Sequence, residues 1–382
     1  MKVAFFLGAL NIGGTESLVF DVLNNCQMTS LDALCIYRKE GSYSEAYKRT
    51  NARLVKLPRQ SSVFKYIWQL RNLIKSEEID ILHAQTPSNA IIGIFASIGT
   101  RASLVTTFHG HFDSLSFFSL QIINLFSKKL ICVSQEVASY YKRRLLGVGI
   151  NNLCVVYNGI DFQKLNNKML RPSCVSEDGF RLCTVGNFQS GRTPLIICSA
   201  LSKIKDSLVE SLNFYFIGRK VEKESKRYNE CVEFCAKRGI LGFDVYDDEN
   251  SVRQTERVNV HFLGGRGDVP AILKTMDGFV YSTENDTFGI AVVEAMAAGL
   301  PVIVNDWEVM REITNDGAWA TLYRSNDAED CADKMAALID DLRKHPDKVH
   351  LRCEKIAKEV RAKFSIENHI RQLEQIYNSI KR

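Results

Sequence analysis

The sequence predicts an α/β protein built from two doubly wound domains, each a parallel sheet covered by helices. Short apolar runs that suit buried strands alternate with segments of helical periodicity along most of the 382 residues. Strand–helix alternation is typical of parallel sheets with helices on both faces. The length fits two domains at about 150 residues each. The alternation is interrupted once, after residues 157–161.

The first half of the chain contains seven strand candidates. The run at residues 2–8 resembles a signal peptide, but it is short and lacks a small-residue cleavage site, so we interpret it as a buried strand. No apolar stretch approaches the roughly 18 to 20 residues of a membrane span. The predicted strands are 2–8, 32–37, 53–56, 79–83, 103–107, 129–133 and 153–156. The predicted helices between them are 15–25, 62–77, 87–98, 115–127 and 135–144.

The second half repeats the pattern after a polar segment that ends near Gly179. Its predicted strands are 180–186, 212–217, 258–263, 277–281, 301–304 and 319–323. We expect domains at 1–160 and 178–364. A helix over 365–382 has a one-sided apolar stripe and could pack on either domain. The charged segment 220–257 is predicted as a helix plus a surface excursion. Its acidic residues Asp244, Asp247, Asp248 and Glu249 indicate a solvated face rather than a metal site.

Composition and charge exclude several classes of protein. Hydrophobic residues are 46% and charged residues 24% of the chain, which is ordinary for a globular protein and excludes disordered, collagen-like and coiled-coil chains. The net charge of +5 is too weak to indicate nucleic acid binding, but it suits an anionic substrate or membrane surface. Eleven scattered cysteines indicate reduced, buried thiols and a cytoplasmic location.

Several catalytic signatures are absent from the sequence. There is no G-x-x-x-x-G-K-[ST] loop, and Gly264-Gly265-Arg266-Gly267 does not complete a dinucleotide fingerprint, because Pro270 occupies the last glycine position. No G-x-S-x-G elbow and no HExxH occur. No Asp-x-Asp pair follows a strand, so no metal ligands are predicted.

The most informative stretch runs from Tyr281 to Val304, where a strand leads through a polar loop into a helix at about 288–298. Open α/β sheets bind ligands at the carboxyl ends of their strands, and free N–H groups at a helix N-terminus suit a diphosphate. Gly289 would let a ligand approach the backbone, and Glu294 could accept bonds from sugar hydroxyls. An ordinary βα unit with an N-cap Asp and a surface Glu explains the same spacing equally well.

This stretch resembles the E-x7-E region of the retaining family-4 glycosyltransferases of GT-B fold. The similarity lies in the pattern F-G-I-x-x-x-E-A-M-A-x-G-x-P-V. Other matching pieces follow in the family's order. They are Gly13-Gly14-Thr15-Glu16, Phe108-His109, Val133-Ser134, Tyr157-Asn158-Gly159-Ile160-Asp161, Val185-Gly186-Asn187, His261-Phe262-Leu263-Gly264 and Asp268-Val269-Pro270. The resemblance implies two Rossmann-like domains that face each other across a cleft.

The resemblance also implies roles on the donor side. Glu294 would hold the ribose, and Asp286, in place of the family's first Glu, would face the donor sugar. Backbone N–H groups of Thr287, Phe288, Gly289 and Ile290 would meet sugar or phosphate. The family places an Arg after the second-domain Gly and a Lys five residues later, both on phosphate. Asn187 and Arg192 stand there, so one cation is missing and Arg192 would hold the diphosphate.

The first domain carries the remaining candidates. His109 would reach the donor sugar or phosphate and is preferred over His111. Gly14 and its neighbour Gly13 would let their loop approach the diphosphate or acceptor, although a plain βα turn is an alternative. His83 and Gln85 end another strand and would line the acceptor side.

Together these features predict a metal-independent, retaining transferase that moves a hexose or N-acetylhexosamine from a nucleotide sugar, expected to be UDP-linked, to a hydroxyl acceptor. The acceptor is expected to be a saccharide or lipid-linked saccharide in surface polysaccharide or glycoconjugate synthesis, with no further cofactor. A nucleotide-sugar 2-epimerase of the same architecture and a non-catalytic nucleotide-sugar binder are the alternatives.

The helix at 115–127 has two interpretations, because it is apolar around most of its circumference and is followed by Lys128 and Lys129. We favour a helix that packs in the core. The alternative is a helix at the inner membrane face, with the lysines on anionic headgroups, which would make the protein peripheral there.

Overall fold

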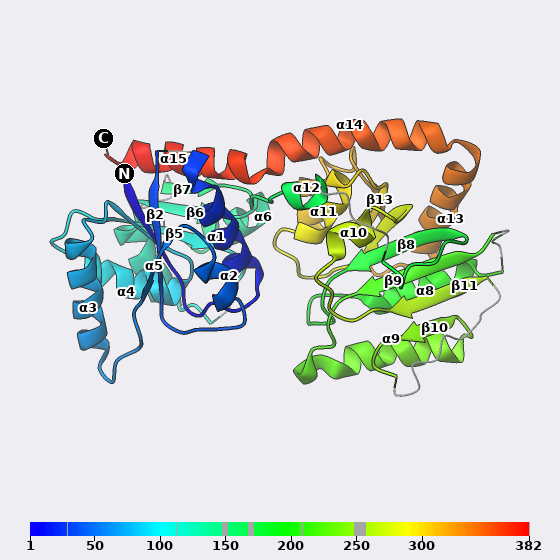
Figure 1. Ribbon diagram of the computed structural model, residues 1–382, viewed down its shortest axis with the longest axis horizontal. Coiled ribbons are helices and arrows are strands. Elements are labelled where there is room, and N and C mark those ends of the chain that lie inside the picture. Colours follow the sequence, from blue (N-terminus) through cyan, green and yellow to red (C-terminus); the bar gives the residue numbers. More distant parts are fainter. Residues whose placement is uncertain are drawn as a thin grey trace. The chain divides into compact units, whose positions relative to one another are not determined.

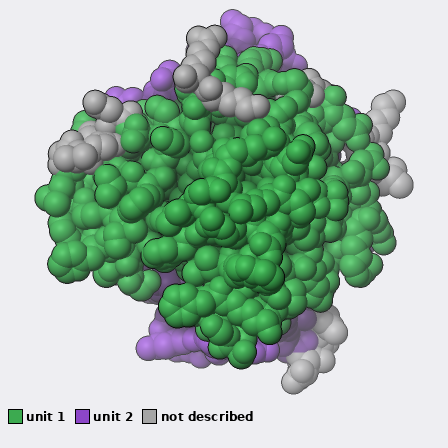
Figure 2. Space-filling model, turned by 90° about the vertical axis from the view of Figure 1, so that its left-hand side faces the viewer, with its two compact units in different colours: residues 1–161, 364–382 green, residues 162–363 purple. Residues whose placement is uncertain are grey.

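The computed structural model describes residues 1–28, 30–112, 114–146, 152–166, 172–206, 208, 210–247 and 257–381 (Figure 1). The chain divides into two compact units, which are coloured separately in Figure 2. Unit 1 comprises residues 1–161 and 364–382, and unit 2 comprises residues 162–363. The second unit is therefore inserted in the sequence of the first.

The sheet of unit 1 has seven parallel strands among the described residues, in the order β3-β2-β1-β4-β5-β6-β7. The order changes direction between β1 and β4, and doubly wound sheets bind ligands at the carboxyl edge beside such a switch point. The strands are β1 (Lys2–Phe6), β2 (Asp32–Tyr37), β3 (Arg53–Lys56), β4 (Ile81–Ala84), β5 (Ser103–Phe108), β6 (Lys129–Cys132) and β7 (Leu153–Val155).

Helices cover both faces of this sheet, and neighbouring strand residues point to opposite cores. Phe6 enters the core beneath α3 (Val63–Ser76), α4 (Pro87–Ser97), α5 (Phe117–Phe126) and α6 (Gln135–Lys142). Phe5 enters the core beneath α1 (Gly14–Asn25), α2 (Ser44–Lys48) and the last helix, α15 (Ile366–Lys381). The predicted apolar stripe of α15 is buried there, so the C-terminal helix completes unit 1.

The sheet of unit 2 also has seven parallel strands in the described part of the chain, in the order β10-β11-β9-β8-β12-β13-β14. Its switch point lies between β8 and β12. The strands are β8 (Phe180–Val185), β9 (Leu212–Ile217), β10 (Leu241–Asp244), β11 (Val258–Phe262), β12 (Gly278–Tyr281), β13 (Val302–Asn305) and β14 (Thr321–Tyr323). Two doubly wound sheets confirm the predicted fold class.

The main helices of unit 2 follow these strands in the chain. Three of them, α8, α9 and α13, bury their apolar sides in one core cluster with the sheet. The helices are α8 (Pro194–Ile204), α9 (Ser225–Lys237), α10 (Val269–Leu273), α11 (Ile290–Ala297), α12 (Glu308–Ile313), α13 (Ala328–Lys344) and α14 (Pro346–Phe364).

Most predicted elements are confirmed, and strands 32–37, 53–56 and 212–217 begin and end as predicted. Strand β10 was not predicted, because its four residues at the sheet edge lie in the charged segment 220–257. Asp244 accepts hydrogen bonds from the Tyr228 hydroxyl and the Tyr246 N–H. Asp248 and Glu249 lie outside the described residues. No cluster in the described part of the chain could hold a metal ion. No described helix is long and apolar enough to cross a membrane.

Candidate active site

The loop between β12 and α11 is organised by one carboxylate. Asp286 Oδ1 accepts hydrogen bonds from three consecutive backbone N–H groups, those of Thr287 at 2.8 Å, Phe288 at 3.2 Å and Gly289 at 3.1 Å. These are N–H groups that we expected to meet sugar or phosphate, and here they meet a protein side chain. Ile290 begins α11, so its N–H is among those that lack an intrahelical acceptor.

The second oxygen of Asp286 contacts two more side chains. Tyr281, the fully buried last residue of β12, donates its hydroxyl hydrogen bond to Asp286 Oδ2. Arg192 Nη2 lies 3.7 Å from the same oxygen, and the guanidinium lies over the Tyr281 ring at 4.3 Å. Burial raises the pKa of Tyr281 well above its usual range, so the phenol stays neutral and remains a donor. The structure therefore brings Arg192 and Asp286, two predicted site residues, into one cluster.

Gly289 meets a structural requirement that its sequence position did not reveal. Its φ is +84°, a left-handed conformation that favours glycine at the N-cap of α11. A Cβ there would lie 2.7 Å from Met310 Cε and 3.1 Å from Ile313 Cδ1. Packing against α12 is thus sufficient to require glycine at this position.

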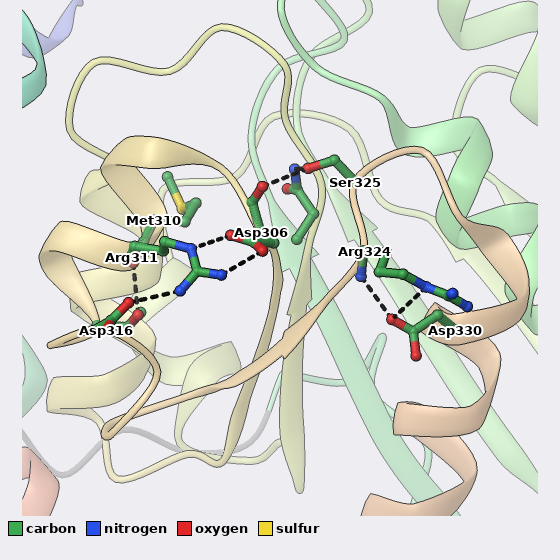
Figure 3. Close-up of polar contacts among 9 residues, drawn as sticks. Asp306, Met310, Arg311, Asp316, Arg324, Ser325 and Asp330 are labelled. Atoms are coloured by element: carbon green, nitrogen blue, oxygen red, sulfur yellow. Dashed lines mark hydrogen bonds and ion pairs between the residues drawn. The ribbon is translucent and has the colours of Figure 1, made fainter.

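Residues at the ends of neighbouring strands fix this loop through hydrogen bonds. Asn305, at the end of β13, accepts from the Thr283 N–H at 2.9 Å and donates to the Thr283 carbonyl at 2.7 Å. Its amide also donates to Ser325 Oγ, which in turn donates to the Asp306 carbonyl. Figure 3 shows the bond from Ser325 to the Asp306 carbonyl, together with the bonds from Arg311 to Asp306. These contacts fix the loop at the end of β12 to the ends of β13 and β14.

Arg192 lies beside a second loop, which follows β8. A Cβ at Gly186 would lie 2.9 Å from Arg192 Cζ, so glycine lets the guanidinium lie close to this backbone. A cavity of about 20 Å³ adjoins them and is lined in part by Asn187, Phe188 and Ser282. The cation therefore lies at the carboxyl ends of β8 and β12, the two strands at the switch point of the sheet.

Asn187 braces a neighbouring loop through its side chain. Its Oδ1 accepts the Arg219 N–H at 3.0 Å, which ties the β8 loop to the residues after β9. Arg219 is exposed, and its aliphatic chain covers Gly265, where a Cβ would lie 2.3 Å from Arg219 Cγ. Lys220 follows it and lies over the rings of Tyr228 and Tyr246.

Arg219 is a candidate that the sequence analysis missed. The family pattern pointed to the position of Asn187 for the first phosphate cation, whereas the structure brings an arginine to Asn187 from another strand. The run Ile217-Gly218-Arg219 after a predicted strand was the available signal. Glu294 lies in the middle of α11 with a partly exposed side chain, as the predicted ribose contact requires.

In unit 1, the predicted histidine lies at the end of β5 and pairs with a predicted neighbour. His109 Nε2 lies 2.8 Å from Gln85 Oε1. An amide oxygen only accepts, so this nitrogen carries the proton. Burial, followed by the nearby His369, lowers the pKa of His109 to about 3, so the ring is neutral at pH 7. The His111 ring instead lies 3.0 Å from the Glu136 carboxylate, so the two histidines have different partners.

The expectation that His83 lines the acceptor side is wrong. His83 is buried, and its ring nitrogens lie 2.7 Å from Tyr377 Oη of α15 and 2.7 Å from Thr107 Oγ1. Desolvation lowers its pKa to about 3. A β4 histidine whose two nitrogens both bond buried hydroxyls is a structural residue, and sequence alone does not reveal that α15 returns to cover it.

Helix α15 also explains the glycine at position 159, which lies in one of the segments that match the family. A Cβ at Gly159 would lie 2.6 Å from His369 Cβ and 2.9 Å from Ile366 Cα, so only glycine admits the helix this close. His369 Nδ1 donates to the Tyr157 carbonyl at 2.7 Å. Burial lowers the pKa of His369 to about 4 despite this bond, which raises it.

The first glycine-rich loop leads into α1. Gly13 is its N-cap with extended backbone, φ −164°, and Gly14 is its exposed first residue. A Cβ at Gly13 would lie 2.7 Å from the Glu16 carboxylate. Burial raises the pKa of Glu16. The loop is therefore open at Gly14, as an approaching ligand requires.

Comparison with known proteins identifies the family. Residues 168–360 match the glycosyl transferases group 1 family, and residues 12–164 match glycosyltransferase family 4. The chain belongs to the group 1, family 4 glycosyltransferases. This confirms the resemblance inferred from the motif at 286–304.

Two curated relatives of this glycosyltransferase have lipid-linked sugars in their names. The UDP-Gal:alpha-D-GlcNAc-diphosphoundecaprenol alpha-1,3-galactosyltransferase of Escherichia coli is 24% identical over 294 residues, 72% of this chain and 70% of that protein. The N,N'-diacetylbacillosaminyl-diphospho-undecaprenol alpha-1,3-N-acetylgalactosaminyltransferase of Campylobacter jejuni is 24% identical, over 73% of each chain.

Solved structures share the fold of this glycosyltransferase. Anabaena HepE in complex with UDP and glucose has a TM-score of 0.78 at 18% identity, covering 99% of this chain and 100% of that one. A glycosyltransferase from Rickettsia africae has a TM-score of 0.81 at 18% identity, covering 99% of each. The likeness confirms the GT-B fold.

Proposed function

We propose that this glycosyltransferase transfers a hexose or N-acetylhexosamine, with retention of anomeric configuration, from a UDP-sugar to a hydroxyl of a saccharide on a lipid diphosphate. One observation supports the donor site above all. The partly buried Arg192 lies at the carboxyl edge of the sheet, at its switch point, beside the Gly186 backbone and just before the N-terminus of α8. Such an arrangement suits a diphosphate.

Arg192 is oriented for that role by its neighbours. Asp286 and the Tyr281 ring hold its guanidinium, so less side-chain freedom is lost when phosphate binds. Arg219 would supply the cation that Asn187 does not, from the loop that Asn187 itself holds. Glu294 would accept hydrogen bonds from ribose hydroxyls.

In the proposed reaction the bond between the anomeric carbon and the diphosphate oxygen breaks. A bond from the same carbon to the acceptor oxygen forms on the same face. The acceptor proton goes to the departing diphosphate, so no protein nucleophile is needed. The protein contributes position and stabilises the charge that develops on the diphosphate. His109 is neutral, so it would hydrogen-bond the donor rather than act as an acid.

The acceptor class is supported by the relatives. Both curated relatives described above carry a diphosphoundecaprenol acceptor in their names. Such an acceptor is anchored in a bilayer, which fits a peripheral protein at the inner membrane face in polysaccharide or glycoconjugate synthesis.

The test is to incubate the protein with UDP-galactose, UDP-glucose and their N-acetyl forms, with and without a synthetic lipid-diphosphate sugar. We expect UDP release that depends on the acceptor, and an α-linked product by NMR. UDP release without acceptor, together with a C2-epimerised sugar, would instead establish an epimerase. UDP-sugar binding without any turnover would establish a non-catalytic binder. Arg192→Ala is the matched inactive control.

A further inference from the structure

The outer surface of unit 1 has an unusual composition over three adjacent helices. α3 neighbours α4, and α4 neighbours α5, in one layer over the sheet (Figure 1). The three helices contain Lys65, Arg71 and Lys75 but no Asp or Glu. The solvent-exposed face of a helix layer ordinarily carries charges of both signs. The lack of acidic residues here indicates that this face also contacts something other than water.

Large apolar side chains are exposed on α3 and α4. Phe64 is 85% exposed and Trp68 is 62% exposed, and both lie in the first two turns of α3 with Val63. Phe95 and Ile98 are exposed at the end of α4. Single exposed apolar residues are common, but a group on adjacent helices marks an interaction site.

Helix α5 continues this surface. Leu120 and Ile123 face the core, whereas Phe118 is 78% exposed and Leu125 is 66% exposed. The expectation of a helix packed in the core therefore holds for one side of α5 only. The other side is exposed at Phe117, Phe118, Ile122, Leu125 and Phe126.

Cations surround these residues. Lys65 is exposed beside Phe64, and Lys128 is exposed just after α5. A Cβ at Gly99 would lie 3.1 Å from Arg71 Nη2, so the Arg71 guanidinium lies near the end of α4. Between Asp80 and Glu136 the sequence has one acidic residue, Asp113, which lies outside the described residues.

Acidic residues at the far end of α3 are paired with cations. Glu77 lies 2.6 Å from an Arg53 nitrogen and 3.3 Å from Lys2 Nζ. Arg101 approaches both Glu78 and Asp80. The net charge of the exposed apolar surface is therefore positive.

We propose that this surface, formed by the exposed apolar residues of α3, α4 and α5 and the cations beside them, docks on an anionic lipid bilayer. Aromatic and aliphatic side chains would enter the interface, and Lys65, Arg71 and Lys128 would meet anionic headgroups. The inference rests on the proposed function for its biological purpose, since docking brings unit 1 to a lipid-linked acceptor. Its physical basis is independent of catalysis.

The experiment is flotation of the full-length protein with phosphatidylcholine vesicles, with and without phosphatidylglycerol, in the absence of donor. The wild type should float with the anionic vesicles at low salt and detach in about 1 M salt, where the screening length is about 3 Å. Failure of the wild type to float under the low-salt condition overturns the proposal.

Variants locate the surface. Phe64→Asp combined with Phe118→Asp should weaken vesicle binding by about 100-fold or more, since each buried phenylalanine contributes about tenfold or more. Lys65→Gln with Arg71→Gln should weaken binding to anionic vesicles by about tenfold or more and leave weak binding to phosphatidylcholine unchanged. Leu351→Asp, at a residue on α14 of unit 2 that is 55% exposed, is the matched control and should bind like wild type.

The outcomes separate this proposal from its rivals and from the proposed function. Wild-type affinity in the Phe64→Asp, Phe118→Asp variant overturns the proposal. A wild-type dimer that becomes monomeric in this variant, with no flotation of either, assigns the surface to a second copy and also overturns it. Acceptor-dependent transfer in detergent without flotation retains the function and removes the docking surface. Flotation without transfer retains the docking surface and removes the proposed function.

Discussion

Replacing Asp286 by asparagine and by alanine separates the helix cap from the ion pair that this side chain forms. Asparagine retains an oxygen for the three backbone N–H groups and caps as well as aspartate. Its NH2 group replaces Oδ2, so the negative charge 3.7 Å from Arg192 is lost, and the Tyr281 hydroxyl accepts from this NH2 group instead of donating to a carboxylate. Both side chains are about one-fifth exposed, at 21% and 18%, so the pair contributes about 1 kcal/mol rather than its full Coulomb energy.

Alanine removes more. The lost cap costs about 1 kcal/mol, and the buried Tyr281 hydroxyl loses its acceptor, which costs about 1 to 3 kcal/mol. We therefore expect a loss of stability of about 1 to 2 kcal/mol for Asp286→Asn and about 3 to 5 kcal/mol for Asp286→Ala. For a unit of this size each 1 kcal/mol lowers Tm by about 2 to 4 °C.

Thermal unfolding measures the difference, and amide hydrogen exchange at residues 286–294 shows whether the loop opens locally. Asp316→Asn, at an exposed carboxylate that pairs with Arg311, is the control and should change stability by less than about 0.5 kcal/mol. Equal destabilisation by asparagine and alanine would show that the backbone bonds of Oδ1 do not stabilise the loop, and the reasoning would fail.

The same asparagine variant tests function. It should bind UDP as well as wild type, since Arg192 keeps its charge and loses a competing anion. If the carboxylate also contacts the donor sugar, transfer should fall far more than stability does, because contacts made in the transition state act on rate. Near wild-type transfer would reduce Asp286 to a helix cap.

Substitutions at three further residues test other parts of the molecule. Arg192→Ala should weaken UDP binding more than uridine binding by calorimetry, and Arg192→Lys should recover part of it; equal losses for both ligands would remove Arg192 from the phosphate. Glu294→Ala should weaken UDP about tenfold or more without unfolding, and unchanged affinity would exclude the ribose contact. His83 and His369 are buried with pKa values lowered to about 3 and about 4, so the unfolded chain takes up protons first as the pH falls below about 6.5. Stability should therefore be complete above pH 7 and fall by about 1.4 kcal/mol per pH unit for each histidine between pH 6.5 and 4; His83→Gln should reduce the slope of denaturant-measured stability against pH, and an unchanged slope would show that His83 is not the titrating group.

Strand positions were predictable because parallel strands that are buried on both faces consist of continuous runs of apolar residues in the sequence. Residues 212–217 are an example. Strand β10 was not, because an edge strand needs few apolar residues, and Leu241 and Phe243 lie among charges. The stripe of α15 was visible as periodicity, but periodicity does not say which sheet it covers.

For the site residues, too, local patterns were predictable and contacts between distant segments were not. The glycine and carboxylate spacing at residues 286–294 is local and indicated a ligand-binding loop and a family. The partners of those residues are distant in sequence: Arg192 reaches Asp286 from another strand, and Asn187 holds the Arg219 backbone. The same holds for His83, whose environment depends on Tyr377, 294 residues away.

The sequence by itself determined the fold class, most strand and helix positions and the family, because these depend on short-range periodicity and on a motif of contiguous residues. Only the tertiary structure decided which side chains are occupied by protein partners, why Gly159 and Gly289 lack side chains, and which side of α5 is exposed. Those properties depend on packing between segments far apart in the chain, and burial and hydrogen bonding exist only once these segments meet.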